Sequence, residues 1–456
     1  MKLNKLTLAN FRGFEQIDID FAEDVTVIAG VNGVGKSGVL KALTTALSLA
    51  LPKFTTSKEA TISFSETDVQ TDKPGLTASV ALNLETAALI VDIARAAPLE
   101  SERAEELLKR RDDLRFATRE TKKGSKEELA INDEIRHIEI LLGDISDVGT
   151  VRFLPKDATA DPNELTKALK GGTHHPLVVF YSTSRFLSRL PPGSPRAKEF
   201  DSSSAYEKSL NQLEVSLNDF ANWYRVVAAG VQTNAKERLF QQLERAVQTF
   251  LPEVASLALH ETRPPRFSVI KGNKKFFLEQ LSDGERGLLA LVFDLTRRLS
   301  IANPDSDDPI AEGVALVLID EIELHLHPKW QRDVLKRLRA TFRCCQFVVT
   351  THSPLVLGEV EARSVRFLEF RDGKVSVTVP SEAYGMDANR ILLEFMDAPV
   401  RNRQVDDEIK NLFTLIDNER FDEARKAIAQ LENKLGADEP ELTRASSLIR
   451  FLEGSE

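Results

Sequence analysis

A glycine-rich stretch, residues 30–37, constrains this chain more than any other part of the sequence. It reads Gly-Val-Asn-Gly-Val-Gly-Lys-Ser and fits the pattern G-x-x-x-x-G-K-[ST], whose glycines let successive backbone N–H groups turn toward an anion at a helix N-terminus. The apolar run 25–29 precedes it and the helical pattern 39–47 follows it. The order strand, loop, helix therefore predicts a phosphate-binding loop.

Each position of this loop has an expected role. We expect Lys36 to reach the β- and γ-phosphates of a nucleotide and Ser37 to ligate Mg²⁺. A glycine-rich turn without a ligand would not require Lys followed by Ser, so ATP and Mg²⁺ are the predicted ligands. The loop residues predicted to bind the nucleotide are Gly30, Asn32, Gly33, Gly35, Lys36 and Ser37.

Composition narrows the class of protein. The chain has 456 residues, 42% of them hydrophobic, and a formal net charge of −10. This charge gives no support to a whole-surface attraction for DNA, so any DNA contact needs a local groove. No apolar run approaches the ~20 residues of a membrane span, and the first residues lead directly into a strand pattern rather than a signal peptide. Cys344 and Cys345 are adjacent and form no disulfide framework or metal cage, so we expect a cytoplasmic protein.

The segments around the loop have recognisable patterns. Residues 2–21 alternate as two antiparallel strands, with Arg12 at their turn, and residues 60–64 and 76–84 are further predicted strands. Residues 99–121 and 126–142 predict a charged helical hairpin, either a solvated surface feature or an arm for a partner or DNA.

The middle of the chain mixes strands and helices. We predict a buried strand at 176–181, a mobile loop at 191–204, helical structure at 210–251 and strands at 266–270 and 275–278. His174 and His175 precede the buried strand and have no carboxylate or Cys nearby, so a loop is favoured over a metal pair.

Further candidate binding and catalytic residues lie in the C-terminal half of the chain. Ser282, with Glu285 three residues later, forms a capping box before a helical pattern at 288–295. The continuous apolar run 314–319 predicts a buried parallel strand that delivers Asp320 and Glu321 to its carboxyl end. We expect Asp320 to hold the Mg²⁺ shell, and Glu321 to orient and deprotonate the attacking water.

Histidines follow this strand. Glu323, His325 and His327 alternate with leucine, which suggests a loop or short strand more simply than a metal site. A third apolar run, 346–349, leads to His352, which either senses the γ-phosphate or is a buried core histidine.

The order of these motifs resembles the ABC-type ATPase head of the SMC and RecF class, over roughly residues 1–92 and 276–379. The resemblance implies an α/β head with Walker A at 30–37, a signature motif at 281–286, Walker B at Asp320 and Glu321, and a switch histidine at His352. It also implies nucleotide contacts from Arg12, Ser282 and Gly284, and a Q-loop ligand at Gln70 or Asp68. Asp283 departs from the usual signature sequence.

Within that class, four stretches are similar to PtuA-type ATPase subunits of Septu and retron-associated anti-phage systems, namely residues 180–185, 281–286, 323–328 and the tail from 384. The resemblance implies homodimers or higher homo-oligomers formed through the heads, a separate nuclease subunit of the HNH type, possible DNA contact and no membrane. The helical tail either docks that subunit or packs on the head. A RecF-like repair ATPase is the alternative; a transporter subunit ranks last, because the inserts and the helical tail do not match that pattern. No acidic nuclease cluster follows residue 379. The predicted parts are an N-terminal lobe (1–92), a helical hairpin (93–145), a mixed insertion (146–275), a C-terminal lobe (276–380) and a helical tail (381–456).

Overall fold

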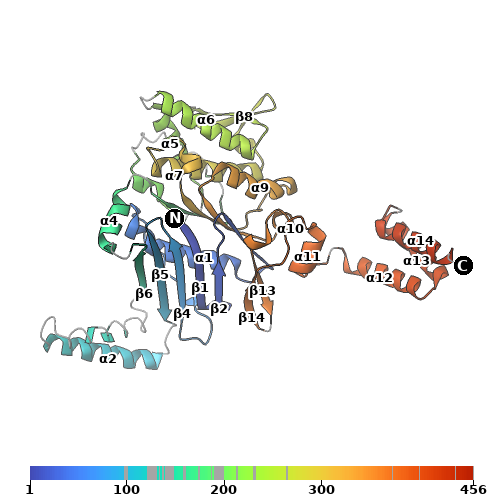
Figure 1. Ribbon diagram of the computed structural model, residues 1–456, viewed down its shortest axis with the longest axis horizontal. Coiled ribbons are helices and arrows are strands. Elements are labelled where there is room, and N and C mark those ends of the chain that lie inside the picture. Colours follow the sequence, from blue (N-terminus) through green and yellow to red (C-terminus); the bar gives the residue numbers. More distant parts are fainter. Residues whose placement is uncertain are drawn as a thin grey trace. The chain divides into compact units, whose positions relative to one another are not determined.

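The computed structural model describes most of the chain, in two compact units, Met1–Asp387 and Ala388–Glu456 (Figure 1). The turn of the predicted hairpin, most of its second helix, His174 and most of the predicted loop 191–204 lie outside the described residues. Those described are 1–96, 101–120, 131–132, 134–135, 138, 148–157, 161–172, 175–185, 187–188, 200–211, 214–229, 233–262, 265–371, 373–399, 401–436 and 438–454.

A six-stranded sheet forms the centre of the first unit, with strand order β14-β13-β3-β12-β11-β7. Five of its strands run parallel, and β14 pairs antiparallel with β13. Every residue of β3, β11 and β12 is buried, as expected for strands covered on both faces. The strands are β3 (Val25–Gly30), β7 (Leu177–Tyr181), β11 (Ala315–Ile319), β12 (Gln346–Thr351), β13 (Val365–Arg371) and β14 (Lys374–Thr378).

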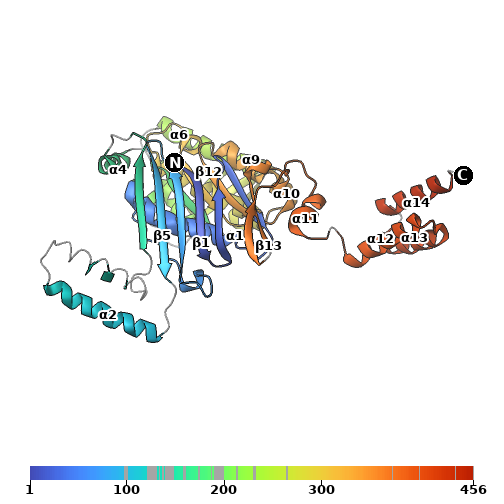
Figure 2. The same cartoon turned by 60° about the horizontal axis from the view of Figure 1, so that its bottom comes forward.

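A second, antiparallel sheet has the order β2-β1-β4-β5-β6 (Figure 2). The helix α1 (Lys36–Phe54) contacts β4, β5 and β6 of this sheet as well as β3 of the first, so it lies between the two. Gln346 also ties the sheets together, because its side chain accepts from Leu3 N and donates to Leu3 O and Ala22 O. The strands are β1 (Lys2–Phe11), β2 (Phe14–Asp20), β4 (Gly75–Asn83), β5 (Ala87–Ala96) and β6 (Val148–Pro155).

Helices and a three-stranded sheet complete this unit. The long helix α7 (Asp283–Ala302) contacts α5, α6, α8 and β7. The sheet has the order β10-β9-β8, from β8 (Val254–His260), β9 (Arg266–Lys271) and β10 (Lys274–Phe277). The remaining helices are α2 (Ser101–Glu120), α4 (Pro162–Gly171), α5 (Leu217–Ala229), α6 (Thr233–Phe250), α8 (Pro309–Glu312), α9 (Pro328–Thr341) and α10 (Pro354–Leu357).

The second unit is helical and has a core of its own. Its helices are α11 (Ala388–Met396), α12 (Arg403–Asp417), α13 (Phe421–Leu435) and α14 (Pro440–Glu453). Leu412, Ile416, Ala424 and Ala445 are fully buried in a cluster shared by α12, α13 and α14. The apolar stripe of α13, with Ala424, Ile428 and Leu431, therefore packs within the tail itself.

The predicted α/β class, with antiparallel N-terminal strands and a helical tail, is confirmed. The predicted strand at 60–64 is wrong: Ile62 N donates to Ser48 Oγ of α1 at 2.8 Å instead of pairing with a strand. The single helical stretch expected at 210–251 is divided between α5 and α6. The further subdivision of the first unit at residues 92, 145 and 275 stays a prediction. No described helix is long and apolar enough to cross a membrane.

Candidate ATPase site

The glycine-rich loop leaves the end of β3 and enters α1, as predicted. Gly30 has φ +148°, and a Cβ there would lie 2.4 Å from the carbonyl oxygen of Leu368. Gly35 has φ +106°, and a Cβ there would lie 2.5 Å from Cζ of Phe14. Gly35 is also the N-cap of α1 and supplies no side-chain hydrogen bond to it. The helix therefore presents its N-terminus to the loop without a capping side chain, which suits a phosphate ligand.

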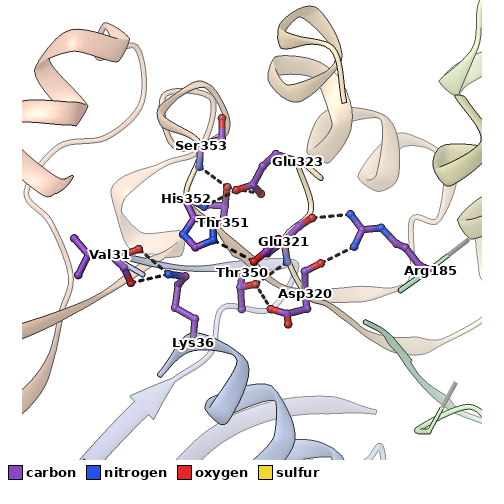
Figure 3. Close-up of polar contacts among 11 residues, drawn as sticks. Val31, Lys36, Arg185, Asp320, Glu321, Glu323, Thr350, Thr351, His352 and Ser353 are labelled. Carbon is purple, nitrogen blue, oxygen red and sulfur yellow. Dashed lines mark hydrogen bonds and ion pairs between the residues drawn. The ribbon is translucent and has the colours of Figure 1, made fainter. Parts of the chain in front are cut away.

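Lys36 folds back onto this loop. Its Nζ donates to Gly30 O at 2.7 Å and to Val31 O at 2.9 Å, and the residue is 6% exposed (Figure 3). Desolvation lowers the pKa of the Lys36 ammonium, while the carboxylates of Glu323, Glu321 and Asp320 oppose that shift. The ammonium thus interacts electrostatically with three carboxylates that follow β11, which is separated from β3 by β12.

Asp320 follows β11 and is held by β12. Its Oδ1 accepts a 2.5 Å hydrogen bond from Thr350 Oγ1, and its backbone N donates to Tyr181 O of β7 at 2.9 Å. The side chain is thereby fixed on the same edge of the sheet as Lys36, although Asp320 and Thr350 are 30 residues apart in the sequence. Sequence reasoning did not assign a role to Thr350.

Glu321 and His352 lie close together, although they follow different strands. His352 Nε2 and Glu321 Oε1 are 3.3 Å apart, and the two side chains are 33% and 32% exposed (Figure 3). Glu321 has φ +47°, an uncommon backbone conformation for a residue with a side chain. Both groups can therefore reach a substrate while the surrounding backbone is held in place.

Glu323 has a defined position that the sequence did not suggest. Its Oε2 accepts from Thr351 Oγ1 at 2.8 Å, and its Oε1 accepts from the backbone N of His352 at 2.5 Å. Glu323 thus holds the end of β12, where His352 begins the following loop. The segment 321–325 forms a turn, which agrees with the predicted loop.

Arg185 is the main residue of this site that sequence reasoning missed. It is 8% exposed, and its guanidinium donates to Asp320 O and Glu321 O at 2.6 Å each and to Ile322 O at 3.3 Å. Desolvation lowers the pKa of Arg185 to about 10, opposed by the carboxylates of Glu323, Asp320 and Glu321. The group is a buried cation on the side of the carboxylates away from Lys36 (Figure 3).

The predicted signature segment begins α7. Ser282 accepts from Glu285 N at 3.3 Å, and Glu285 Oε2 accepts from Ser282 N and Oγ, which is the predicted capping box. Lys271 donates to Glu285 Oε1 at 2.8 Å, and Asp283 pairs with Arg286. Ser282 is exposed, and the hydrogen bonds of its described surroundings do not connect it to the phosphate-binding loop.

Gly284 packs within its own chain. A Cβ there would lie 2.5 Å from the carbonyl oxygen of His325, so the first turn of α7 approaches the turn that follows Asp320 and Glu321. This contact explains the need for glycine at position 284. Its predicted contact with a nucleotide stays a prediction.

Arg12 and Asp68 form an ion pair beside α1. Arg12 Nε donates to Asp68 Oδ1 at 2.7 Å, and Lys41 Nζ donates to Asp68 Oδ2 at 2.6 Å. A Cβ at Gly38 would lie 3.7 Å from a guanidinium nitrogen of Arg12, so Arg12 lies along the first turn of α1. Burial favours the neutral acid, but hydrogen bonds from Lys41, Ser65 and Arg12 prevail and hold the pKa of Asp68 at about 2.

These contacts separate the two Q-loop candidates. Both carboxylate oxygens of Asp68 already have cationic partners. The buried Oε1 of Gln70 has no hydrogen-bond partner in the described structure, while Gln70 N donates to Asn10 O at 2.8 Å. Gln70 is thus the better candidate ligand of the two.

His327, one half of the candidate His-x-His metal site, has a structural role. His327 Nδ1 accepts from Lys329 N at 3.3 Å and caps α9. Within the described residues, no group of three or more His, Cys, Asp or Glu side chains is arranged to hold a metal by itself. The predicted Mg²⁺ would instead share its ligands with the nucleotide phosphates, as Mg²⁺ commonly does.

The region from β3 to α10 matches a known protein family. The family described as "AAA domain, putative AbiEii toxin, Type IV TA system" matches residues 25–358. The chain belongs to this AAA-domain family. The predicted class of ATPase is therefore confirmed, and the AAA domain contains the phosphate-binding loop, Asp320, Glu321 and His352.

Three relatives of this chain are retron or Septu proteins of bacteria. The chain is 32% identical over 246 residues to the retron Ec83 probable ATPase of Escherichia coli, covering 52% of this chain and 44% of that protein. It is 23% identical to the retron Vc95 probable ATPase of Vibrio cholerae, over 88% of this chain and 80% of the relative. It is 27% identical to the Septu protein PtuA of Bacillus mycoides, over 52% of this chain and 34% of that protein. The match thus spans less than half of two of these relatives.

A solved Smc head bound to the C-winged helix domain of ScpA is also similar in fold. It shares 14% identity at a TM-score of 0.46, covering 83% of this chain and 97% of that chain.

Proposed function

We propose that this protein binds and hydrolyses ATP as a subunit of a bacterial anti-phage defence complex. The observation that carries the proposal is the convergence of Lys36, Asp320, Glu321 and His352 at one edge of the six-stranded sheet. The named retron and Septu relatives support the setting. A cytoplasmic location accords with this setting.

The residues of the loop fit a triphosphate substrate. The N-terminus of α1 lacks a capping side chain, and a Cβ at Gly33 would meet nothing within 4 Å, so the loop has an accessible backbone. Lys36 would exchange its bonds to Gly30 O and Val31 O for the β- and γ-phosphates. Ser37 and Asp320 would hold Mg²⁺, with Gln70 as a further candidate, and bound Mg²⁺ would neutralise phosphate charge.

Glu321 would act on the attacking water. Its carboxylate is partly exposed and lies 3.3 Å from His352 Nε2. We propose that Glu321 orients the water and accepts its proton, and that His352 contacts the γ-phosphate side of the substrate. Thr350 and Glu323 hold the two strand ends from which these side chains extend.

We further propose that two heads pair around the nucleotide, each supplying Ser282 to its partner's site. Ser282 is exposed at the N-terminus of a 20-residue helix, where partial positive charge suits a phosphate. Arg12 would add a nucleotide contact within the same chain. A separate nuclease, of the HNH type by resemblance, would bind the complex, and DNA contact would be local.

The proposal is tested by expressing the chain from its native operon and purifying it. We expect MgATP hydrolysis, its loss together with ATP binding in Lys36→Ala, and co-elution of a nuclease encoded beside it. Deleting residues 405–456 should leave hydrolysis measurable, because the tail helices have a core of their own. The same deletion should release the nuclease, because we propose that the helical tail is its docking site. Hydrolysis without a nuclease partner, but with DNA-stimulated turnover, would favour a repair ATPase instead.

A further inference from the structure

The turn that carries Glu321 is held by an unusually complete set of backbone hydrogen bonds. On the donor side, Asp320 N donates to Tyr181 O, Glu321 N to Thr350 Oγ1 and Ile322 N to Thr350 O. On the acceptor side, the carbonyls of Asp320, Glu321 and Ile322 all accept from Arg185. Three successive peptide groups are thereby fixed on both sides.

Arg185 is suited to this task by its chemistry. The planar guanidinium presents five donors in fixed directions on three separated nitrogens, so one side chain can bind three carbonyls, whereas a lysine ammonium carries its three donors on one rotating nitrogen. The side chain is almost fully buried, so water does not compete with it at those carbonyls while it is in place. Glu321 also has a positive φ of 47°, a backbone conformation that persists only where surrounding contacts hold it.

The charge of Arg185 also matters. Asp320, Glu321 and Glu323 are three carboxylates in one small region, and each interacts electrostatically with both Lys36 and Arg185. Lys36 is expected to turn toward phosphate when ATP binds, whereas Arg185 remains engaged with the backbone. Arg185 thus supplies a permanent positive charge that allows the carboxylates to stay close together.

We infer that Arg185 is a positioning residue for ATP hydrolysis, which fixes the turn 320–322 so that the Glu321 carboxylate is directed at the substrate. It acts through the backbone and does not contact the reacting atoms. The inference rests on the proposed ATPase function, and its test includes one measurement that is independent of that function.

The chain offers a matched control in Arg366. Arg366 is 9% exposed and donates to the backbone carbonyls of Asp20, Arg363 and Val365, at 2.6, 2.7 and 2.9 Å. Desolvation lowers the pKa of Arg366 as well. It therefore has a similarly small exposed fraction and the same type of bonds as Arg185, but it holds no part of the 320–322 turn.

The experiment compares Arg185→Lys, Arg185→Ala and Arg366→Lys in the full chain. We expect Arg185→Lys to lower kcat by roughly 10–100-fold, because small misplacements of catalytic groups have effects of this size, with the Kd for MgATP within about twofold of the parent. Added guanidinium should partly restore kcat to Arg185→Ala, and Arg366→Lys should turn over near the parent rate. A parent-like kcat in Arg185→Lys, or an equal loss in both lysine variants, would overturn the inference.

Hydrogen exchange without nucleotide provides the independent measurement. Amides of residues 320–322 should exchange at least tenfold faster in Arg185→Lys than in the parent and remain unchanged in Arg366→Lys. Unchanged exchange in Arg185→Lys would show that Arg185 does not fix the turn 320–322. Should the parent hydrolyse no ATP, the proposed function fails, while the exchange experiment still decides whether Arg185 fixes this turn.

Discussion

Glu321 shows at the scale of single residues how the proposed chemistry depends on one side chain. Glu321→Gln keeps the size and hydrogen-bonding capacity of the side chain but removes its ability to accept a proton. We expect a fall in kcat of ~10²–10⁴-fold, the usual contribution of a general base, with MgATP binding retained. Single-turnover hydrolysis and calorimetric titration measure the two quantities, and a parent-like rate would assign the base elsewhere.

Asp68 provides a prediction about stability and pH. Its pKa lies at about 2, below the ordinary 3.8, so its ion pairs stabilise the folded state above pH 4 and lose their effect as the pH falls toward 2. A shift of this size corresponds to about 2 kcal/mol at pH 7. We expect Asp68→Asn to lower the free energy of unfolding by that amount at pH 7 and by roughly half as much near pH 3.

Urea denaturation followed by tryptophan fluorescence suits this measurement, because both tryptophans, Trp223 and Trp330, lie in the first unit. Asp72→Asn is the control, since Asp72 is exposed and close to Asp68 in the chain. It should change the free energy of unfolding by less than about 0.5 kcal/mol at either pH. A difference between parent and Asp68→Asn that does not shrink on acidification would contradict the role of the ion pairs.

The residues that sequence reasoning placed and missed differ in a physical way. Gly30, Lys36 and Ser37 lie within one continuous segment, residues 30–37, so a local sequence motif identifies them. Arg185 is 135 residues from Asp320, and Thr350 is 30 residues from it, so their contacts exist only after the sheet has formed. No local pattern distinguishes such residues from ordinary buried arginines and threonines.

At the scale of secondary structure, α7 connects the signature segment to the turn after β11 through Gly284. A methyl group at position 284 would lie 2.5 Å from His325 O, and backbone must move to relieve that contact. We expect Gly284→Ala to lower kcat by roughly 10–100-fold through displacement of the catalytic turn. Steady-state ATP hydrolysis measures the effect.

Gly287 in the same helix is the matched control. A Cβ there would meet nothing within 4 Å, and its φ is not in the left-handed region. Gly287→Ala should therefore stabilise the protein by roughly 0.5–1 kcal/mol and leave kcat unchanged. Equal activity of the two variants would show that the contact between α7 and His325 does not influence turnover.

Element types followed from the sequence where periodicity and burial agree. The strands β3, β11 and β12 lie at their predicted positions, because a continuous apolar run marks each of these fully buried strands. The tail is helical, as predicted. The segment 60–64 has strand-forming residues but packs along α1, with Phe64 against Phe11. Tertiary contacts there override local propensity.

At the scale of the whole molecule, the proposal requires two copies. Mixing Lys36→Ala with Ser282→Arg gives mixed dimers in which one site carries both defects and the other carries neither. If subunits exchange and sites act independently, about a quarter of the parental activity should return in a symmetric dimer. Subunit exchange is followed separately by fluorescence energy transfer between labelled chains; exchange without recovered activity would mean that Ser282 only caps its helix.

The position of β3 in the sheet also affects how the protein is made. Its neighbours β12 and β13 begin at residues 346 and 365, whereas β3 ends at residue 30. At typical synthesis rates of ~5–20 residues per second, the glycine-rich loop leaves the ribosome about 15–60 s before either strand that flanks it. A nascent chain that stops before Gln346 contains every residue of the phosphate-binding motif but neither of the strands that flank β3. ATP can thus assist folding only near the end of translation, and the long interval makes the unpaired, apolar β3 a natural target for chaperones.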